Sequence, residues 1–277
     1  MVIGAGSGGG RTATELGRLG LPLTIVDLPG ENLEEHNIVR HELGYDSLGK
    51  LKITELAGHI HNLNPETPIT CFELDVTKQR DEFARLVESQ KPDVLVAATD
   101  NLASKHSINE VALRHGVPVV GAGVYDGGIA GECYITRPGA ACFACLATHL
   151  QLEEIAPKKE LNIDYNNLDL DAIRSTAALN LDIAQIALIQ SRVVLNLLLG
   201  GEPDLIGIPE EYNLIVFANR RVPGHFERPL HADFIHYSRL SDCLVCGNHS
   251  TPDITHEAEQ ILAALEMNHV AGRTPSA

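Results

Sequence analysis

Apolar runs and apolar residues at helical spacing alternate along the first half of the sequence. Short, nearly unbroken apolar runs predict buried parallel strands. Residues that recur three and four positions apart predict helices that cover a sheet. The pattern predicts strands at 2–3, 21–27, 69–76, 93–98, 118–121 and 128–137, and helices at 11–19, 47–62, 81–89 and 102–115. This alternation is typical of a doubly wound, Rossmann-like α/β sheet.

The pattern changes after Pro138. We expect the polar, acidic segment 151–171 to be an exposed crossing loop and the apolar stretch 172–199 to be one long helix. Further predicted elements are antiparallel strands at 212–218 and 225–230, a helix at 253–266 and a disordered end from 271. We interpret 1–137 as a nucleotide-binding half and 138–267 as a second half of one integrated domain, followed by the tail 268–277.

Composition narrows the class of protein. The 277-residue chain is 44% hydrophobic with a formal net charge of −16, which predicts a globular protein and argues against duplex DNA or an anionic membrane surface as the main partner. No unbroken apolar run approaches the roughly 18 residues of a membrane span, and no signal segment is recognised. We therefore expect a cytoplasmic protein. Because Met1 stands directly before the first strand, we also expect this chain to be a domain of a longer one.

The first apolar run ends in a glycine-rich turn, G-x-G-x-x-G, made by Gly4, Gly6 and Gly9. Such a turn brings backbone N–H groups against phosphate, and the following helix adds the positive end of its dipole. Asp27 ends the second strand, where a carboxylate can accept hydrogen bonds from ribose hydroxyls. The pattern predicts a nucleotide site without naming the nucleotide, so a nicotinamide or flavin oxidoreductase is one reading.

Polar and charged residues of both signs follow the predicted strands. They are Asn37, Arg40, Lys52, Asp100 and Asn101. In a doubly wound sheet the carboxyl ends of the strands form the ligand crevice. Arg40 and Lys52 are therefore candidates to bind a triphosphate, and Asp100 is a candidate ligand of its magnesium ion. Taken singly, Arg40 and Lys52 would equally fit solvated surface cations.

Two C-x-x-C pairs, Cys142/Cys145 and Cys243/Cys246, lie about a hundred residues apart. Four thiolates from two such turns match a tetrahedral structural zinc site, and Gly247 would allow the second turn to be tight. Because four ligands leave no open position, we expect a structural metal rather than a catalytic one. Two independent dithiols are the alternative.

The other cysteines and the histidines show no ligand spacing. Cys71 and Cys133 alternate with apolar residues in predicted strands, and we expect both to be buried as small hydrophobes. The histidines at 41, 59, 61, 106 and 115 have no partner pattern, so we interpret them as structural or solvated.

In combination these residues resemble the ubiquitin-activating-enzyme-like adenylyltransferases of the ThiF/MoeB family. The resemblance covers nearly the whole chain. It rests on the glycine loop, Asp27, Asn37-Ile38-Val39-Arg40, Gly49-Lys50-Leu51-Lys52, Thr99-Asp100-Asn101 with Lys105 and Asn109, and the two cysteine pairs in order.

The resemblance implies an ATP- and magnesium-dependent adenylation of the C-terminal carboxylate of a ubiquitin-like or sulfur-carrier protein, typically ending in Gly-Gly. The products are an acyl-adenylate and pyrophosphate. By similarity, Asp27 would bind the ribose, Asn37, Arg40 and Lys52 the phosphates, and Asp100 the magnesium. The resemblance also implies a homodimer or a fused partner domain, as in the activating domains of bacterial fusion proteins.

Three features depart from the family pattern. Family members commonly begin with a helical arm that carries an arginine for the partner's ATP, and we expect either an upstream segment to supply it here or catalysis to be impaired. Arg11 stands where a small residue is usual, and Leu28-Pro29-Gly30-Glu31 replaces a second aspartate after Asp27. Finally, no cysteine lies between Leu146 and Asp242, so we expect adenylation without a loop-cysteine thioester. The alternative is a catalytically weak scaffold subunit of such an enzyme.

Overall fold

The computed structural model describes residues 1–155, 178–200 and 207–247. Its strands are β1 (Val2–Ile3), β2 (Leu23–Asp27), β3 (Ile69–Glu73), β4 (Leu95–Ala97), β5 (Val119–Val124), β6 (Ala130–Thr136), β7 (Leu214–Ala218) and β8 (His231–Ile235). Its helices are α1 (Ser7–Arg18), α2 (Lys52–Leu63), α3 (Arg80–Gln90), α4 (Leu102–His115), α5 (Phe143–Ile155) and α7 (Asn180–Leu198), with short 3-10 turns at Glu35–Asn37, Tyr45–Ser47 and Asp126–Gly128.

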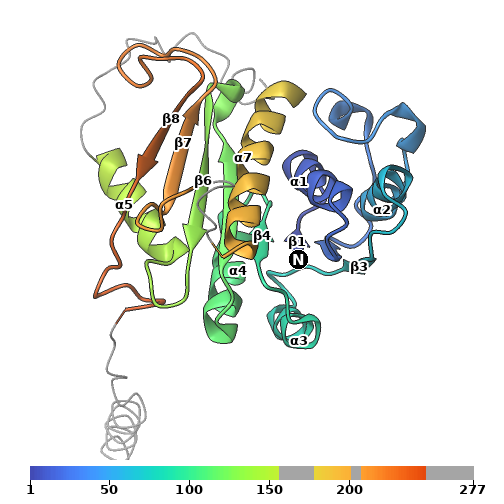
Figure 1. The fold of residues 1–277 in the computed structure, drawn as a ribbon, viewed down its shortest axis with the longest axis horizontal. Coiled ribbons are helices and arrows are strands. Elements are labelled where there is room, and N and C mark those ends of the chain that lie inside the picture. The colour runs from blue at the N-terminus through green and yellow to red at the C-terminus, as the bar shows by residue number, and fades with distance from the viewer. Residues whose placement is uncertain (156–177, 201–206, 248–277) are drawn as a thin grey trace, which may run out of the picture.

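The strands form one sheet in the order β3-β2-β1-β4-β5-β6-β7-β8 (Figure 1). Strands β1 to β5 pair in parallel, and β6, β7 and β8 extend the sheet in antiparallel fashion. The strand order reverses between β1 and β4, and open α/β sheets bind ligands at such a switch point. The prediction of a doubly wound sheet with added antiparallel strands is confirmed.

Helices cover both faces of this sheet. Helices α1, α2 and α7 cover one face through Leu16, Leu56 and Val194, which are almost fully buried. On the other face, α3, α4 and α5 contribute buried residues such as Phe83 and Ile108 to a second core. Because both faces are covered, the central parallel strands β1 and β4 are apolar and buried throughout, as their unbroken runs predict.

Helix α7 packs against α1 and against strands β5 and β6 (Figure 1). By length and composition alone it would also fit a membrane span. However, its Gln190 is buried in the protein interior, where Nε2 donates hydrogen bonds to the carbonyls of Ala97 and Val120 (3.4 and 3.1 Å) and Oε1 accepts one from Thr12 Oγ1 (3.0 Å). These bonds satisfy a buried amide and join α7 to β4, β5 and α1 beside the switch point.

Several predicted boundaries are wrong. Helix α1 begins at Ser7, inside the glycine turn, rather than at residue 11. Strand β8 lies at 231–235 instead of 225–230, because Val222 and Phe226 first close a tight turn. The long helix begins at Asn180, since Leu179 is extended (φ −70°, ψ 158°).

Among the described residues of the second half, one helix was not predicted. Helix α5 starts at the first cysteine pair and continues to Ile155, so it includes the beginning of the segment expected to be a loop. The rest of that segment, the predicted helix 253–266 and the tail lie outside the described residues. One sheet runs through both predicted halves, and their boundary at 137 stays a prediction.

The two unpaired cysteines differ. Cys133 is buried in the central strand β6, as predicted. The prediction for Cys71 is wrong: it is exposed, because β3 is the edge strand of the sheet and much of that strand faces solvent.

Candidate functional site

The glycine loop connects β1 to α1, and its three glycines do different things. Gly4 has a φ of +102°, and a Cβ there would lie 2.6 Å from the Ala98 carbonyl oxygen. At Gly9 a Cβ would lie 1.9 Å from the carbonyl oxygen of Gly4. A Cβ at Gly6, by contrast, would meet no atom within 4 Å. Gly4 and Gly9 therefore allow close packing, whereas Gly6 leaves open space in front of the N-terminus of α1, where a phosphate can approach backbone N–H groups.

Asp27 lies at the carboxyl end of β2, beside this loop. Burial raises the pKa of its carboxyl, and hydrogen bonds from the backbone N–H groups of Leu28 and Ala5, together with the charge of Lys52, oppose that rise. The bond from Ala5 joins the carboxylate directly to the glycine loop. Asp27 is thus placed where the sequence predicts it.

Lys52 is the first residue of α2, and its side chain is only 13% exposed. Its Nζ lies 2.8 Å from Oε2 of Glu31, a carboxylate that is 43% exposed. The segment 28–31, which departs from the family pattern, therefore still supplies an acid to this lysine. A ligand phosphate at Lys52 would compete with a partly solvated carboxylate, which gives up such a contact at low cost.

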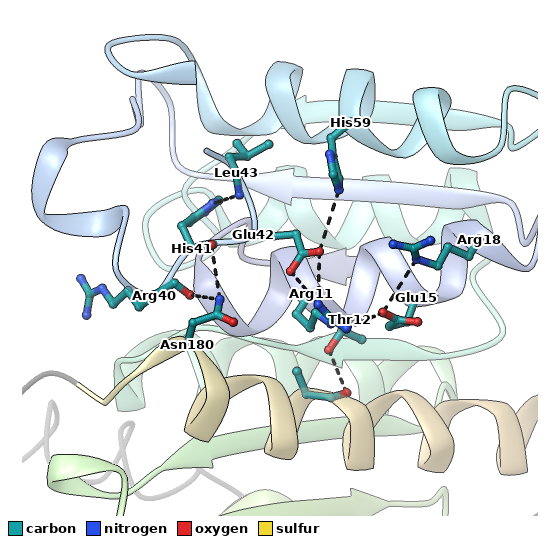
Figure 2. A network of polar contacts seen from close by, with 11 residues as sticks. Arg11, Thr12, Glu15, Arg18, Arg40, His41, Glu42, Leu43, His59 and Asn180 are labelled. Carbon is teal, nitrogen blue, oxygen red and sulfur yellow. Dashed lines mark hydrogen bonds and ion pairs between the residues drawn. The ribbon is translucent and has the colours of Figure 1, made fainter. Parts of the chain in front are cut away.

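Asn37 and Arg40 lie in the segment between β2 and α2. Asn37 is buried, and its Oδ1 accepts a hydrogen bond from the Glu34 N–H (3.0 Å), which shapes the short turn before Arg40. The guanidinium of Arg40 extends away from the neighbouring polar contacts (Figure 2). Its Nε is buried, and no acceptor for it is found among the described residues. A buried donor of this kind is satisfied when an anionic ligand binds.

Asp100 and Asn101 follow β4 and have different surroundings. Thr99 lies next to Gly4, and the side chain of Asp100 beyond it is exposed. Asn101 caps α4, because its Oδ1 accepts a hydrogen bond from the Ser104 N–H (2.8 Å). The structure thus gives Asn101 a helix-capping contact, and leaves Asp100 accessible to a cation.

The structure brings most of the predicted residues together. The charge of Lys52 acts on Asp27, and the charges of Lys52 and Arg40 both act on His41. Asp100 belongs to the same edge, because β1 pairs in parallel with both β2 and β4 and their carboxyl ends are level. We call the glycine loop and these four charged residues the cradle.

His41 contacts the cradle through the glycine loop, and the sequence did not reveal this contact. It is buried, its Nδ1 accepts a hydrogen bond from the Leu43 N–H (3.1 Å), and its Nε2 lies 2.9 Å from the Ala5 carbonyl oxygen. Burial lowers the pKa of this imidazole. Its place directly after Arg40 was the available signal, but nothing in the spacing showed that the ring would reach the glycine loop.

The four predicted metal ligands form a cluster of their own. The Sγ atoms of Cys142, Cys145, Cys243 and Cys246 all lie within 4.8 Å of one another, and three of the residues are buried. Individual Sγ–Sγ distances are 4.0 Å (142–145), 3.8 Å (142–243) and 3.5 Å (145–246). Tetrahedral zinc with bonds of about 2.3 Å separates its sulfurs by about 3.8 Å. The geometry of this cysteine cluster therefore fits a four-thiolate metal.

Local contacts hold the two cysteine turns in place. Asn109 of α4 accepts a hydrogen bond from the Phe143 N–H (2.9 Å) at the start of α5, and the Leu240 N–H donates to Cys145 Sγ (3.5 Å). In the second turn, the Gly247 N–H donates to the Cys243 carbonyl (2.8 Å). Burial raises the pKa of the Cys142 thiol. A bound cation would therefore have to stabilise the thiolate and release its proton.

These features define a Rossmann-like α/β protein with a cluster of four cysteines. The chain belongs to the ThiF family, which matches residues 1–228. It is 28% identical over 148 residues to the SAMP-activating enzyme E1 of Haloferax volcanii, covering 53% of this chain and 52% of that protein. It is also 28% identical over 153 residues to the adenylyltransferase and sulfurtransferase MOCS3 of Caenorhabditis briggsae, covering 53% and 35%.

The chain spans about half, or less, of the length of these curated relatives. Among solved structures, E. coli MccB crystallised with ATP aligns with a TM-score of 0.64 at 16% identity, covering 89% of this chain and 66% of that one. At this level of identity the likeness is one of fold.

Proposed function

We propose that the protein catalyses ATP- and magnesium-dependent adenylation of the C-terminal carboxylate of a ubiquitin-like or sulfur-carrier protein. The observation that carries the proposal is the cradle: an open glycine loop surrounded by Asp27, Arg40, Lys52 and Asp100 in a ThiF-family chain. The names of the relatives, an activating enzyme and an adenylyltransferase, support the same reaction.

The four charged cradle residues and Asn37 each receive a role. Asp27 would bind the ribose, Asn37, Arg40 and Lys52 the phosphates, and Asp100 the magnesium. A carboxylate oxygen of the substrate forms a bond to the α-phosphorus while the bond to pyrophosphate breaks. Since the carboxylate is already ionised at neutral pH, no general base is needed. Fixed cations stabilise the charge that develops on the phosphorus more than they stabilise the bound substrate.

The chain is expected to stop at the adenylate. It has no cysteine between Leu146 and Asp242. Four of its six cysteines form the cysteine cluster, and burial in β6 raises the pKa of Cys133. Exposed Cys71 lies on the edge strand β3, and partial burial raises the pKa of its thiol too. We therefore propose transfer of the adenylate to an external thiol, sulfide or amine.

We further propose that the cysteine cluster binds one structural zinc ion and that the protein works in the cytoplasm, where thiols stay reduced. We also propose that the chain works as a homodimer or together with a fused partner domain. The sulfur–sulfur distances support the zinc assignment.

ATP–pyrophosphate exchange tests this function. Purified protein with magnesium is screened against ubiquitin-like proteins that end in Gly-Gly. We expect one of them to support exchange, and Lys52→Ala and Asp100→Ala to reduce the rate at least about 100-fold. Asp81→Ala, on the exposed start of α3, is the control and should exchange like the unmodified protein. Exchange that survives Asp100→Ala would contradict the proposal, and binding of ATP without exchange would favour the scaffold role.

A further inference from the structure

Residues 40–42 contact three neighbouring parts of the fold, and Figure 2 shows the contacts of Arg40 and His41 with Asn180 and of Glu42 with Arg11. The carbonyls of Arg40 and His41 accept hydrogen bonds from Asn180 Nδ2 at the start of α7 (2.9 and 3.3 Å). The ring of His41 contacts the glycine loop, and Glu42 forms an ion pair with Arg11 of α1 (3.2 Å). The segment that carries Arg40 is therefore bound to α7, to the loop and to α1 at once.

The contact of His41 is the one that joins the two sides of the cradle. Because Nδ1 accepts a hydrogen bond from Leu43, the proton of the neutral ring sits on Nε2, which donates to the carbonyl of Ala5. His41 is only 6% exposed. Its ring therefore links Ala5 of the glycine loop to Leu43, in the segment that carries Arg40.

We propose that His41 is a positioning residue for nucleotide binding: its imidazole fixes the glycine loop relative to Arg40, so that the loop N–H groups and the guanidinium reach the same phosphates. The proposal rests on the proposed function, because it takes the nucleotide to be ATP. His41 itself does not touch the nucleotide; it acts through Ala5 and through the backbone that carries Arg40.

Protonation should break this bridge. A charged ring carries a proton on Nδ1, which would then face the Leu43 N–H instead of accepting from it. Burial lowers the pKa of His41, Lys52 of α2 and Arg40 act in the same direction, and the Ala5 carbonyl and Glu42 oppose them. Arg11 of α1 approaches through its pair with Glu42. Since the folded-state pKa lies below the ordinary value of about 6.5, the neutral ring stabilises the fold above that pH, and this contribution is lost as the pH falls.

Direct binding of ATP, without any protein substrate, tests the proposal. Calorimetry over the whole pH range in which the protein stays folded would compare the unmodified protein with His41→Ala and His41→Gln. Glutamine keeps a donor for the Ala5 carbonyl but cannot titrate. At pH 7.5 we expect His41→Ala to raise the Kd at least about tenfold, and His41→Gln to raise it by less than about threefold. The control is His61→Gln, because the Nε2 of His61 also contacts a backbone carbonyl, that of Thr67 (3.0 Å), away from the cradle.

The pH profile separates positioning from simple stabilisation. Protonation of ATP affects every variant equally, so the ratio of the Kd of the unmodified protein to that of His41→Gln should rise several-fold in acid. Nitrogen NMR of His41 should show the Nε2–H tautomer near neutral pH. Two results would overturn this inference while leaving the proposed function intact. One is an equal rise of the Kd for ATP in acid for the unmodified protein and His41→Gln, and the other is a normal Kd in His41→Ala. If the unmodified protein binds no ATP at any pH, the proposed function fails as well. If His41→Ala does not fold, the glutamine profile and the tautomer decide.

Discussion

The cradle and the cysteine cluster are assembled by different means. The cradle combines the glycine loop after β1, residues at or after the level ends of β2 and β4, Arg40 from the segment before α2, and Lys52 at the start of α2. Lys52 forms an exchangeable ion pair with the partly exposed Glu31. The sulfurs of the cluster are largely buried and come from two turns about a hundred residues apart in the sequence. The cradle is therefore a product of sheet geometry, whereas the cluster exists only where the two turns meet. Damage to the first should cost binding, and damage to the second should cost stability.

The largest effect is expected from the cysteine cluster. Cys145→Ser should remove the metal and lower the free energy of unfolding by several kcal/mol, because a structural zinc ion contributes its binding free energy to folding. Metal content per chain and urea unfolding measure both results. The control is Cys71→Ser, on the exposed edge strand, which should change stability by less than about 0.5 kcal/mol. A stoichiometric zinc ion that persists in Cys145→Ser would show that the cluster is not its site.

A pair of glycine substitutions separates packing from binding within one loop. Gly9→Ala places a Cβ 1.9 Å from the Gly4 carbonyl oxygen, and we expect it to destabilise the fold by roughly 3 kcal/mol. Gly6→Ala meets no atom within 4 Å, so its stability should stay within about 0.5 kcal/mol of the original. It should nevertheless bind ATP at least about tenfold more weakly, because its methyl group fills the phosphate approach. Normal ATP affinity in Gly6→Ala would place the nucleotide elsewhere.

The smallest effect concerns the ion pair at Lys52. Glu31→Gln frees the ammonium group for phosphate, and we expect ATP affinity to rise about threefold at low salt and less at high salt. The free energy of unfolding should change by no more than about 1 kcal/mol, since the carboxylate of Glu31 is partly solvated. The control is Glu88→Gln on α3, which removes one exposed negative charge but does not affect the ion pair of Lys52. Weaker binding in Glu31→Gln alone would mean that Glu31 orients Lys52 rather than competing for it.

Long-range contacts account for the elements that were mispredicted. The place of Asp27 was predictable because it ends a strand, whereas α2 begins at Lys52 rather than at the predicted residue 47. Cys71 was misplaced because alternation shows which residues share a face of a strand, but does not show that the strand is at an edge. Strand β8 was misplaced because its register depends on pairing with β7, which residues 225–230 cannot reach from within their own turn.

The sequence by itself determined the doubly wound architecture, the glycine loop, the charged residues that follow the strands and the two cysteine pairs. Each of these depends on periodicity or on spacing within a few residues, which local physics controls. Only the tertiary structure decided that His41 bridges the glycine loop to Arg40, that Glu31 pairs with Lys52, and that Gln190 joins α7 to β4, β5 and α1 beside the switch point. These contacts join residues up to 178 positions apart, and each depends on a packing geometry that no local pattern encodes.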